Sequence, residues 1–317
     1  SAASQTAFFS AQARPAVGTL ATVAGVGPAQ IAGDGGPALA ASLRSVGALA
    51  RGDDGTLYIS DASTVRAVDP KTGVITRVAG TGSPYFDSDG KLAIDTSFSV
   101  GQIRQGADGA GYVLGGLRIR RIDPSTRRVA TVVGTGVYGC TDALGLLAKD
   151  AKITGGDFVF DARGNIFLTQ YPDETEKCMG AIRRVDAASG VITTLAVKDL
   201  PASFAPTILT IDPKGNLYAY DEKNFQIFRI DAKPLADGRL QATAIAGVAG
   251  KQGDTTGAGD GGPATAAPLN SVVDIVVNGF MQAYSLDRGY RVAHHGEAIV
   301  PSSGFGAKAV PFKTQAF

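Results

Sequence analysis

Short runs of β-branched and aromatic residues, each bounded by a turn signal, set the hydrophobic pattern of this chain. The clearest stretch has such runs at residues 57–59, 65–68 and 74–76, and their Val, Ile, Leu and Tyr content is typical of strands. Asp54-Gly55 predicts a hairpin turn because both residues tolerate positive φ. Residues 69–73, Asp-Pro-Lys-Thr-Gly, predict a second turn. The stretch therefore predicts three short strands joined by tight turns.

This strand-and-turn unit recurs along the chain. Its hairpin turn reappears at Gly109, Gly164 and Gly215, each time ahead of an apolar run, and a fourth strand precedes each turn, as in residues 46–50 and 208–211. Equivalent glycines close successive units and stand 55, 54 and 113 positions apart, the last interval spanning two units; they are Gly25, Gly80, Gly134 and Gly247. A period of roughly 40–50 residues with four strands per unit is the signature of a propeller blade.

A second motif lies between the units. Residues 33–38, Gly-Asp-Gly-Gly-Pro-Ala, match residues 259–264, and residues 87–93 are a weaker copy. Together with Val-Ala-Gly, Asp-Gly-Thr-Leu-Tyr-Ile-Ser-Asp and Val-Arg-Ala-Val-Asp, this motif resembles the NHL-repeat β-propellers of bacterial extracytoplasmic proteins. The resemblance covers about residues 20–300. Its motifs are specific for the fold and say little about activity.

The resemblance and the chain ends together predict the architecture. Five units are recognisable, the fifth being degenerate, and residues 19–23 occupy the position of a blade's last strand. That strand must close a blade whose other strands come from the C-terminus. We therefore predict an all-β fold, a β-propeller of four-stranded blades closed by pairing of the terminal strands. NHL relatives are usually six-bladed, so six blades are favoured and five are the alternative.

We expect residues 1–317 to form a single propeller domain. Residues 1–17 are an N-terminal extension that either precedes or joins the closing blade, and residues 302–317 are a C-terminal tail or closing strand. Glycine supplies 42 of the 317 residues, which the many tight turns explain, and a hydrophobic content of 44% is enough for a packed core.

Charge and hydropathy exclude two classes of partner. A formal net charge of +1 gives no general attraction to nucleic acids or to anionic membranes. The chain has no run of about 18 apolar residues, so no membrane-spanning helix is predicted.

The two cysteines bear on localisation. In a propeller, the connection between blades and the loop between a blade's second and third strands emerge on the same face. Cys140 lies in such a connection and Cys178 in such a loop of the same unit, so a disulfide is predicted, with two unrelated thiols as the alternative. A disulfide implies an oxidising compartment. Residues 1–17 are rich in Ala, Ser and Gln, which fits a chain whose signal peptide has been removed or one that was trimmed. A periplasmic or secreted protein is expected.

Few residues are candidates for metal binding, and no cofactor is expected. Asp87 and Asp89 are the candidate ligands of a structural calcium ion, since they offer two carboxylates at alternate positions, although the distal Glu of an EF-hand loop is missing. Asp34 and Asp260 recur in the glycine-rich motif, where a turn-locking side-chain hydrogen bond is the simpler role.

Two further patterns have a structural interpretation. Residues 134–139 spell G-x-G-x-x-G, but a dinucleotide site needs this motif at the head of a βαβ unit, so we interpret it as a repeat junction. Arginines recur on the third strand of the units with aspartates in register, which predicts ion pairs from blade to blade. The arginines are Arg66, Arg120, Arg121, Arg183, Arg184, Arg229 and Arg291, and the aspartates are Asp69, Asp123, Asp186 and Asp231.

The histidines do not indicate a catalytic centre. His294 and His295 are the only two, and neighbours along a strand point to opposite faces. A three-histidine metal site cannot be completed. No catalytic residue is therefore assigned, and the sequence favours a non-catalytic role while leaving the enzymatic alternative open; if the chain is an enzyme, we expect a metal-dependent lyase or hydrolase.

The face that carries the blade connections and the second-to-third-strand loops is the predicted ligand-binding surface. Aromatic and polar groups gather there on loops that a rigid scaffold holds. The candidates are Tyr85, Phe86, Asp87, Tyr138, Tyr171, Glu174, Lys223, Asn224, Arg288 and Tyr290.

These features predict an exported, non-catalytic binding propeller that recognises a protein, peptide or glycan through its loop-rich face. Two alternatives stay open. One is a propeller lyase or lactonase with its site at the central channel, which the resemblance suggests; the other is a structural module of a larger assembly. An enzyme should converge carboxylates, histidine or a metal on the channel, whereas a binding module should show an exposed aromatic patch. The sequence leaves the ligand and the oligomeric state open.

Overall fold

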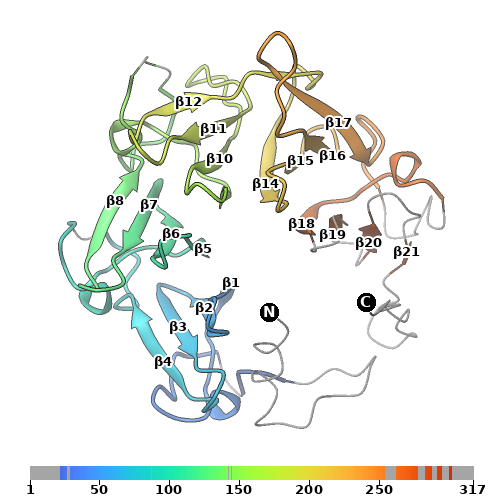
Figure 1. The fold of residues 1–317 in the computed structure, drawn as a ribbon. Coiled ribbons are helices and arrows are strands. Elements are labelled where there is room, and N and C mark those ends of the chain that lie inside the picture. Colours follow the sequence, from blue (N-terminus) through green and yellow to red (C-terminus); the bar gives the residue numbers. More distant parts are fainter. Residues whose placement is uncertain are drawn as a thin grey trace. The chain divides into compact units, whose positions relative to one another are not determined.

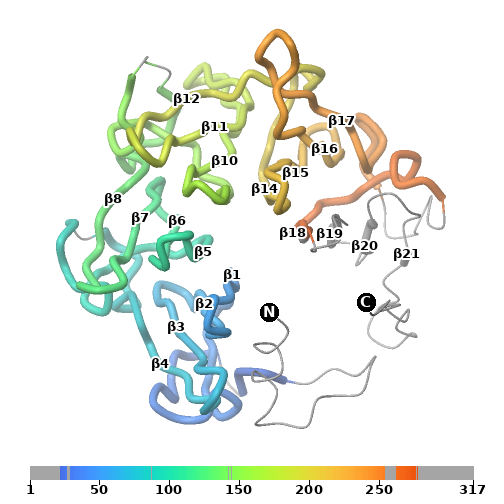
Figure 2. Tube along the Cα trace, viewed as in Figure 1, coloured from blue at the N-terminus to red at the C-terminus, as the bar shows by residue number. Residues whose placement is uncertain are grey.

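A computed structural model describes residues 22–26, 29–86, 88–141, 143, 145–253, 262–277, 283–287, 291–294 and 300–301 (Figures 1 and 2). These residues fall into two compact units, divided between Val132 and Val133. In both units the chain forms sheets in which four consecutive strands pair antiparallel, each with the next along the sequence. This is the predicted all-β propeller architecture of four-stranded blades.

Unit 1 contains two of these blades. Within each, the strands lie side by side in chain order, from the first strand at one edge of the sheet to the fourth at the other (Figure 1). Blade 1 consists of β1 (Val46–Arg51), β2 (Leu57–Asp61), β3 (Thr64–Val68) and β4 (Ile75–Ala79). Blade 2 consists of β5 (Gln102–Gln105), β6 (Gly111–Gly115), β7 (Arg118–Ile122) and β8 (Val129–Val133).

Unit 2 contains three sheets of the same kind. Blade 3 consists of β9 (Phe158–Phe160), β10 (Ile166–Gln170), β11 (Ala181–Val185) and β12 (Ile192–Thr194). Blade 4 consists of β14 (Pro206–Ile211), β15 (Leu217–Asp221), β16 (Gln226–Ile230) and β17 (Leu240–Ala246), to which the short β13 (Val197–Lys198) adds a parallel fifth strand. The fifth sheet consists of β18 (Val272–Val277), β19 (Ala283–Asp287), β20 (Arg291–His294) and β21 (Val300–Pro301).

The predicted turns are present. Gly55 has a φ of 89°, and the Asp54 carboxylate accepts hydrogen bonds from the Thr56 backbone N–H at 3.0 Å and the Thr56 hydroxyl at 2.9 Å. At the second turn Gly73 has a φ of 68°, and Asp69 Oδ1 accepts hydrogen bonds from the N–H groups of Lys71 and Thr72 at 2.7 and 2.8 Å. Each turn therefore combines a left-handed glycine with an aspartate that satisfies the exposed backbone donors.

Four of the connections that lead into a blade share one backbone arrangement. In the connections that enter blades 1, 2 and 3 and the fifth sheet, a glycine N–H donates to the first carbonyl of a three-residue 3₁₀ helix: η1 (Ala38–Ala40), η2 (Ala93–Asp95), η3 (Ala148–Asp150) or η4 (Ala264–Ala266). The donors are Gly25, Gly80, Gly134 and Gly247, at 2.9, 2.9, 2.8 and 3.0 Å. Gly134 begins the G-x-G-x-x-G stretch, so that stretch is a repeat junction, as interpreted. Figure 2 allows the chain to be followed through the junction from β4 to β5.

Neighbouring blades within a unit pack through apolar side chains. Between blades 1 and 2 the buried residues include Val65, Ile103 and Val113. Between blades 3 and 4, Phe167 and Leu217 belong to one buried cluster. These interfaces provide the core that a single sheet lacks.

The prediction of ion pairs from blade to blade is wrong. Three pairs join residues two positions apart within the same blade, because side chains at i and i+2 of a strand lie on one face. They are Arg121–Asp123 at 2.9 Å, Arg184–Asp186 at 2.9 Å and Arg229–Asp231 at 2.8 Å. Three other arginines are buried, and each contacts the connection that enters its blade. They are Arg66, Arg120 and Arg183.

In blade 1, Arg66 Nε donates to Asp34 Oδ1 at 3.0 Å, and its two terminal nitrogens donate to the carbonyls of Ser42 and Ala32. In blade 3, Arg183 donates to Gln170 Oε1 at 2.7 Å and to the Thr141 carbonyl at 2.9 Å. The arginine therefore fixes the incoming junction against its own blade.

Several predictions fall outside the described residues. These are the closing strands near both termini, including residues 1–17 and 302–317, together with Asp260 and His295. The number of blades and the closure of the propeller stay predictions. His294 lies at the end of β20.

Candidate ligand-binding face

The loop between β10 and β11 is the most elaborate loop of blade 3. A disulfide joins Cys178 in this loop to Cys140 in the preceding junction, with a Cα–Cα distance of 5.7 Å, as predicted. Asp173 and Cys178 exchange backbone hydrogen bonds of 2.9 and 2.8 Å, and Asp173 Oδ1 accepts from the Glu176 N–H at 2.8 Å. Because of these links, the loop presents its side chains from a fixed backbone.

An exposed apolar and aromatic group lies on this loop and its junction. The exposed fractions are 51% for Val137, 39% for Tyr138, 38% for Tyr171 and 71% for Met179. We call these four residues the tyrosine patch. Tyr138 also forms an isolated parallel bridge with Ile153, and the Tyr171 N–H donates to Thr154 Oγ1 at 2.7 Å. Exposed tyrosines on a braced backbone are typical of recognition surfaces, because they offer contact area at low entropic cost.

Both phenols are protonated at neutral pH, since the ordinary pKa of tyrosine is about 10 and the surroundings of these two raise it further. Partial desolvation, the Asp173 carboxylate and its hydrogen bond to the Tyr138 hydroxyl (3.2 Å) raise the pKa of Tyr138. Desolvation and the carboxylates of Glu222 and Asp221 raise the pKa of Tyr171. Each phenol can therefore stack on a ligand and also serve as a hydrogen-bond donor.

The corresponding loop of blade 4 continues the same face of unit 2. It connects β15 to β16 and carries Lys223 and Asn224. The buried Asp221 carboxylate accepts from the N–H groups of both residues at 3.2 Å, and Asn224 Nδ2 donates to Asp221 Oδ2 at 2.7 Å. Within unit 2 the structure thus places Tyr138, Tyr171, Glu174, Lys223 and Asn224 on loops of the predicted kind.

In unit 1, the predicted aromatic residues lie on the junction into blade 2. Tyr85 is 79% exposed and Phe86 is 42% exposed. The guanidinium carbons of Arg118 and Arg120 lie 5.1 and 5.4 Å from the Phe86 ring centroid. Both arginines therefore make cation–π interactions with this ring.

The candidate calcium ligand Asp89 has protein partners. Its carboxylate oxygens accept from the Thr131 hydroxyl at 2.9 Å and the Thr131 N–H at 2.8 Å, and Arg120 Nε lies 3.9 Å away. Asp87, Arg288 and Tyr290 lie outside the described residues. Within the described part of the chain, no three His, Cys, Asp or Glu side chains are placed to hold a metal ion.

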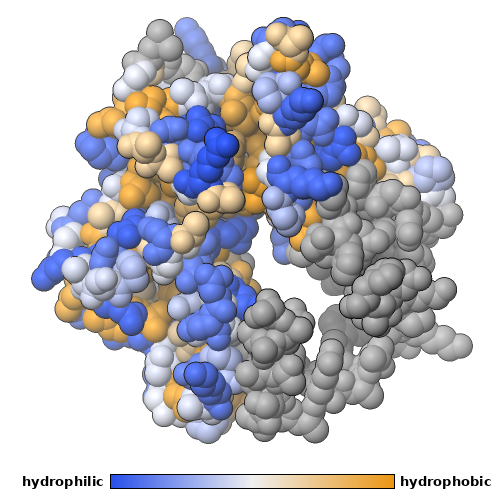
Figure 3. Space-filling model, in the orientation of Figure 1, coloured by the Kyte–Doolittle hydropathy of each residue, from blue (hydrophilic) through white to orange (hydrophobic). Residues whose placement is uncertain are grey.

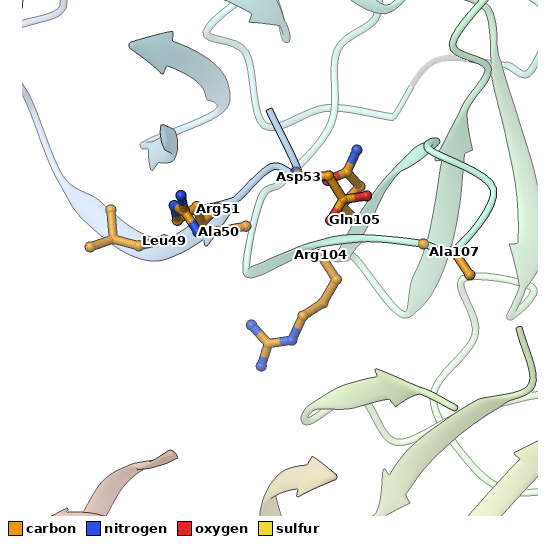
Figure 4. Close-up of a pocket in the computed structure, with 8 residues that line it drawn as sticks. Leu49, Ala50, Arg51, Asp53, Arg104, Gln105 and Ala107 are labelled. Atoms are coloured by element: carbon orange, nitrogen blue, oxygen red, sulfur yellow. The ribbon is translucent and has the colours of Figure 1, made fainter. Parts of the chain in front are cut away.

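Sequence reasoning missed a hollow in unit 1. It has a volume of about 310 Å³ and lies where the first strands of blades 1 and 2 end, between Leu49, Arg51 and Arg104 (Figure 4). The Gln105 side chain turns toward Asp53 and accepts its N–H at 2.9 Å, whereas the Arg104 side chain extends away from its strand. The sequence does contain a signal for this hollow, because Arg51 is the last residue of β1 and Arg104 is the next-to-last residue of β5.

Hydrophilic and hydrophobic residues are interspersed over the described blades on the side seen in Figure 3. None of the helices in the described ranges is long and apolar enough to cross a membrane.

Comparisons with known proteins show the fold. No protein-family model matches the chain, and no curated protein matches its sequence. Among solved structures, the chain is similar to a gluconolactonase from Xanthomonas campestris, with 15% identity, a TM-score of 0.51, and coverage of 81% of this chain and 76% of that one. It is also similar to an auxiliary nutrient binding protein from Bacteroides thetaiotaomicron, with 13% identity, a TM-score of 0.54, and coverage of 81% of this chain and 56% of that one.

A third similar structure is a protein of unknown function from Bacteroides thetaiotaomicron, with 16% identity, a TM-score of 0.51, and coverage of 79% of this chain and 57% of that one. The chain spans little more than half the length of the two Bacteroides proteins. At these identities the likeness concerns the β-propeller fold alone.

Proposed function

We propose that this protein is an exported, non-catalytic propeller of the NHL-repeat type that binds a protein, peptide or glycan through its loop-rich face. The observation that carries the proposal is the tyrosine patch, which stands on a loop braced by a disulfide. The disulfide supports an oxidising compartment, periplasmic or secreted.

The chemistry of the patch supports binding. Tyr138 and Tyr171 present flat rings with neutral hydroxyl donors, and Val137 and Met179 add apolar area. Asp173 and Glu176 lie beside Tyr138, and Lys152 Nζ lies 3.8 Å from Glu176 Oε2. A surface of rings, hydroxyls and neighbouring charged groups suits a ligand that combines apolar faces with hydrogen-bonding groups, as peptides and glycans do.

The test is a binding screen of the purified, oxidised protein on peptide and glycan arrays. The variant Tyr138→Ser/Tyr171→Ser should lose at least tenfold in affinity for whatever the wild type binds, because exposed aromatic anchors dominate such interfaces. The control Leu235→Ser removes an apolar side chain of similar exposure (36%) from the β16–β17 turn of the same unit and should bind normally. Unchanged binding by the double variant, or no binding by the wild type on either array, would refute the proposal.

A further inference from the structure

Within unit 1 a second cavity lies between blades 1 and 2, beside the hollow of Figure 4. We call it the interblade cleft. Its volume is about 350 Å³, which is within the range of small-molecule sites. Val65, Ile103 and Val113 give it an apolar floor, and Tyr58, Arg104 and Arg127 line its walls. It lies toward the ends of the blades that carry the β1–β2 and β3–β4 turns.

The cleft exists because blade 1 departs from the repeat at one position of its third strand. In blades 2, 3 and 4 the aromatic residue at the second position of the second strand pairs across the sheet with an arginine. In blade 1 the partner of Tyr58 is Ala67. The pairs are Tyr58 with Ala67, Tyr112 with Arg121, Phe167 with Arg184, and Tyr218 with Arg229. The missing side chain leaves space on the side of Tyr58 that faces blade 2.

Blade 2 departs from the repeat on the opposite wall. The second strand begins with Leu57, Ile166 and Leu217 in blades 1, 3 and 4, but with Gly111 in blade 2. A Cβ atom built on Gly111 would have no atom within 4 Å. Between blades 3 and 4, by contrast, Leu217 is 2% exposed and belongs to the same buried cluster as Phe167. The leucine side chain that fills that interface therefore has no counterpart between blades 1 and 2, where the third-strand arginine is also replaced by Ala67.

The walls of the cleft favour a negatively charged guest. Asp54 already accepts hydrogen bonds from Thr56, and Asp123 is held by Arg121 and by the N–H groups of Ser125 and Thr126. The Arg127 guanidinium makes no ion pair within the described part of the chain, and its charge acts on the Tyr58 phenol. Desolvation and Asp54 raise the pKa of Tyr58, so its hydroxyl is protonated and can donate.

We propose that the interblade cleft is a binding site for a small amphipathic anion, an aromatic or alicyclic carboxylate. Its ring lies against Tyr58 over the aliphatic floor, and its carboxylate faces Arg127 and Arg104, since a guanidinium is the natural partner of a carboxylate. This site is made of residues outside the tyrosine patch, so it stands independently of the function proposed above.

The experiment uses 2-naphthoate as the probe and 2-naphthalenemethanol as its neutral counterpart, with saturation-transfer NMR on the full-length protein. The wild type should bind the naphthoate saturably and at least tenfold more tightly than the alcohol. Gly111→Leu restores the repeat residue and fills the cleft, so it should abolish saturable binding of both probes. Ala67→Arg should do the same, and Asp69, two residues on, offers the new arginine the partner that Asp123 offers Arg121.

Arg127→Gln tests the role of charge. It should weaken naphthoate binding by about tenfold, the usual cost of losing one charge-assisted contact, and leave the affinity for the alcohol unchanged. Leu235→Ser, in the β16–β17 turn of unit 2, is the control and should bind both probes as the wild type does. The proposal is overturned if the wild type does not bind naphthoate saturably, if Gly111→Leu with wild-type thermal stability still binds it, or if Arg127→Gln weakens both probes equally.

Discussion

Arg66 and Asp34 form an ion pair across 32 residues of chain, with Arg66 Nε 3.0 Å from Asp34 Oδ1. The arginine side chain is fully buried, whereas the Asp34 side chain is 35% exposed. A second carboxylate, that of the buried Asp61, lies 3.4 Å from Arg66 Nη1. The third strand of blade 1 is thereby tied both to the end of its second strand and to the junction that enters the blade.

Arg66→Met should lower the free energy of unfolding by about 3–5 kcal/mol, the usual cost of removing one member of a buried ion pair. The substitution leaves the Asp61 carboxylate without its cation and the carbonyls of Ser42 and Ala32 without their donors. Urea denaturation measures the loss. Arg229→Met is the matched control, since its pair with Asp231 is one-third exposed and should contribute at most about 1 kcal/mol. Equal losses would show that burial does not set the importance of these arginines.

The junction glycines can be tested by comparing two that lie close together. Gly80 and Gly82 have φ values of 84° and 89°, so alanine is strained at both. A Cβ on Gly80 would also lie 2.2 Å from the Ser63 carbonyl oxygen, whereas one on Gly82 would have no atom within 4 Å. Gly82→Ala should cost about 1 kcal/mol for the left-handed backbone alone, and Gly80→Ala about 3 kcal/mol or more. Similar melting temperatures for the two variants would contradict the close approach.

The blade repeat could be predicted from the sequence because its signals are local. Asp54-Gly55 and residues 69–73 specify their turns through the conformations that Asp, Pro and Gly allow. The disulfide was also predictable, because the order of strands alone places Cys140 and Cys178 on the same rim. Each of these inferences needs only neighbouring residues or the topology of a repeat.

The ion-pair partners could not be predicted in the same way. Arg120 and Arg121 are adjacent, but one is buried toward the junction and the other is 29% exposed in a pair with Asp123. Which face of a strand is buried depends on the neighbouring blade, not on the strand itself. The interblade cleft had a signal that alignment of the repeats would reveal, namely Ala67 and Gly111 in place of larger residues. Its volume, however, depends on how two blades pack.

The disulfide is expected to stabilise blade 3 and its loop. Thiol titration of the denatured, unreduced protein should find no free thiol, and reduction should release two. Cys140→Ser/Cys178→Ser should lose about 2–4 kcal/mol of stability, because the unfolded chain is no longer constrained. The variant should also bind the array ligands more weakly, since the tyrosine patch stands on the loop that the disulfide holds. Two free thiols before reduction would refute both the bond and the argument for export.

Stability should decrease in alkali because of buried tyrosines. Burial and the Asp212 carboxylate, 3.3 Å from its hydroxyl, raise the pKa of Tyr218 to about 12. Between about pH 10 and pH 12 the unfolded chain therefore loses this proton while the folded protein keeps it, so the free energy of unfolding falls as pH rises, by about 2 kcal/mol from this residue. Urea denaturation from pH 8 upward should show a shallower fall for Tyr218→Phe than for the wild type. Tyr85→Phe, which alters a side chain that is 79% exposed, should keep the wild-type slope; if both variants keep it, Tyr218 is not the source.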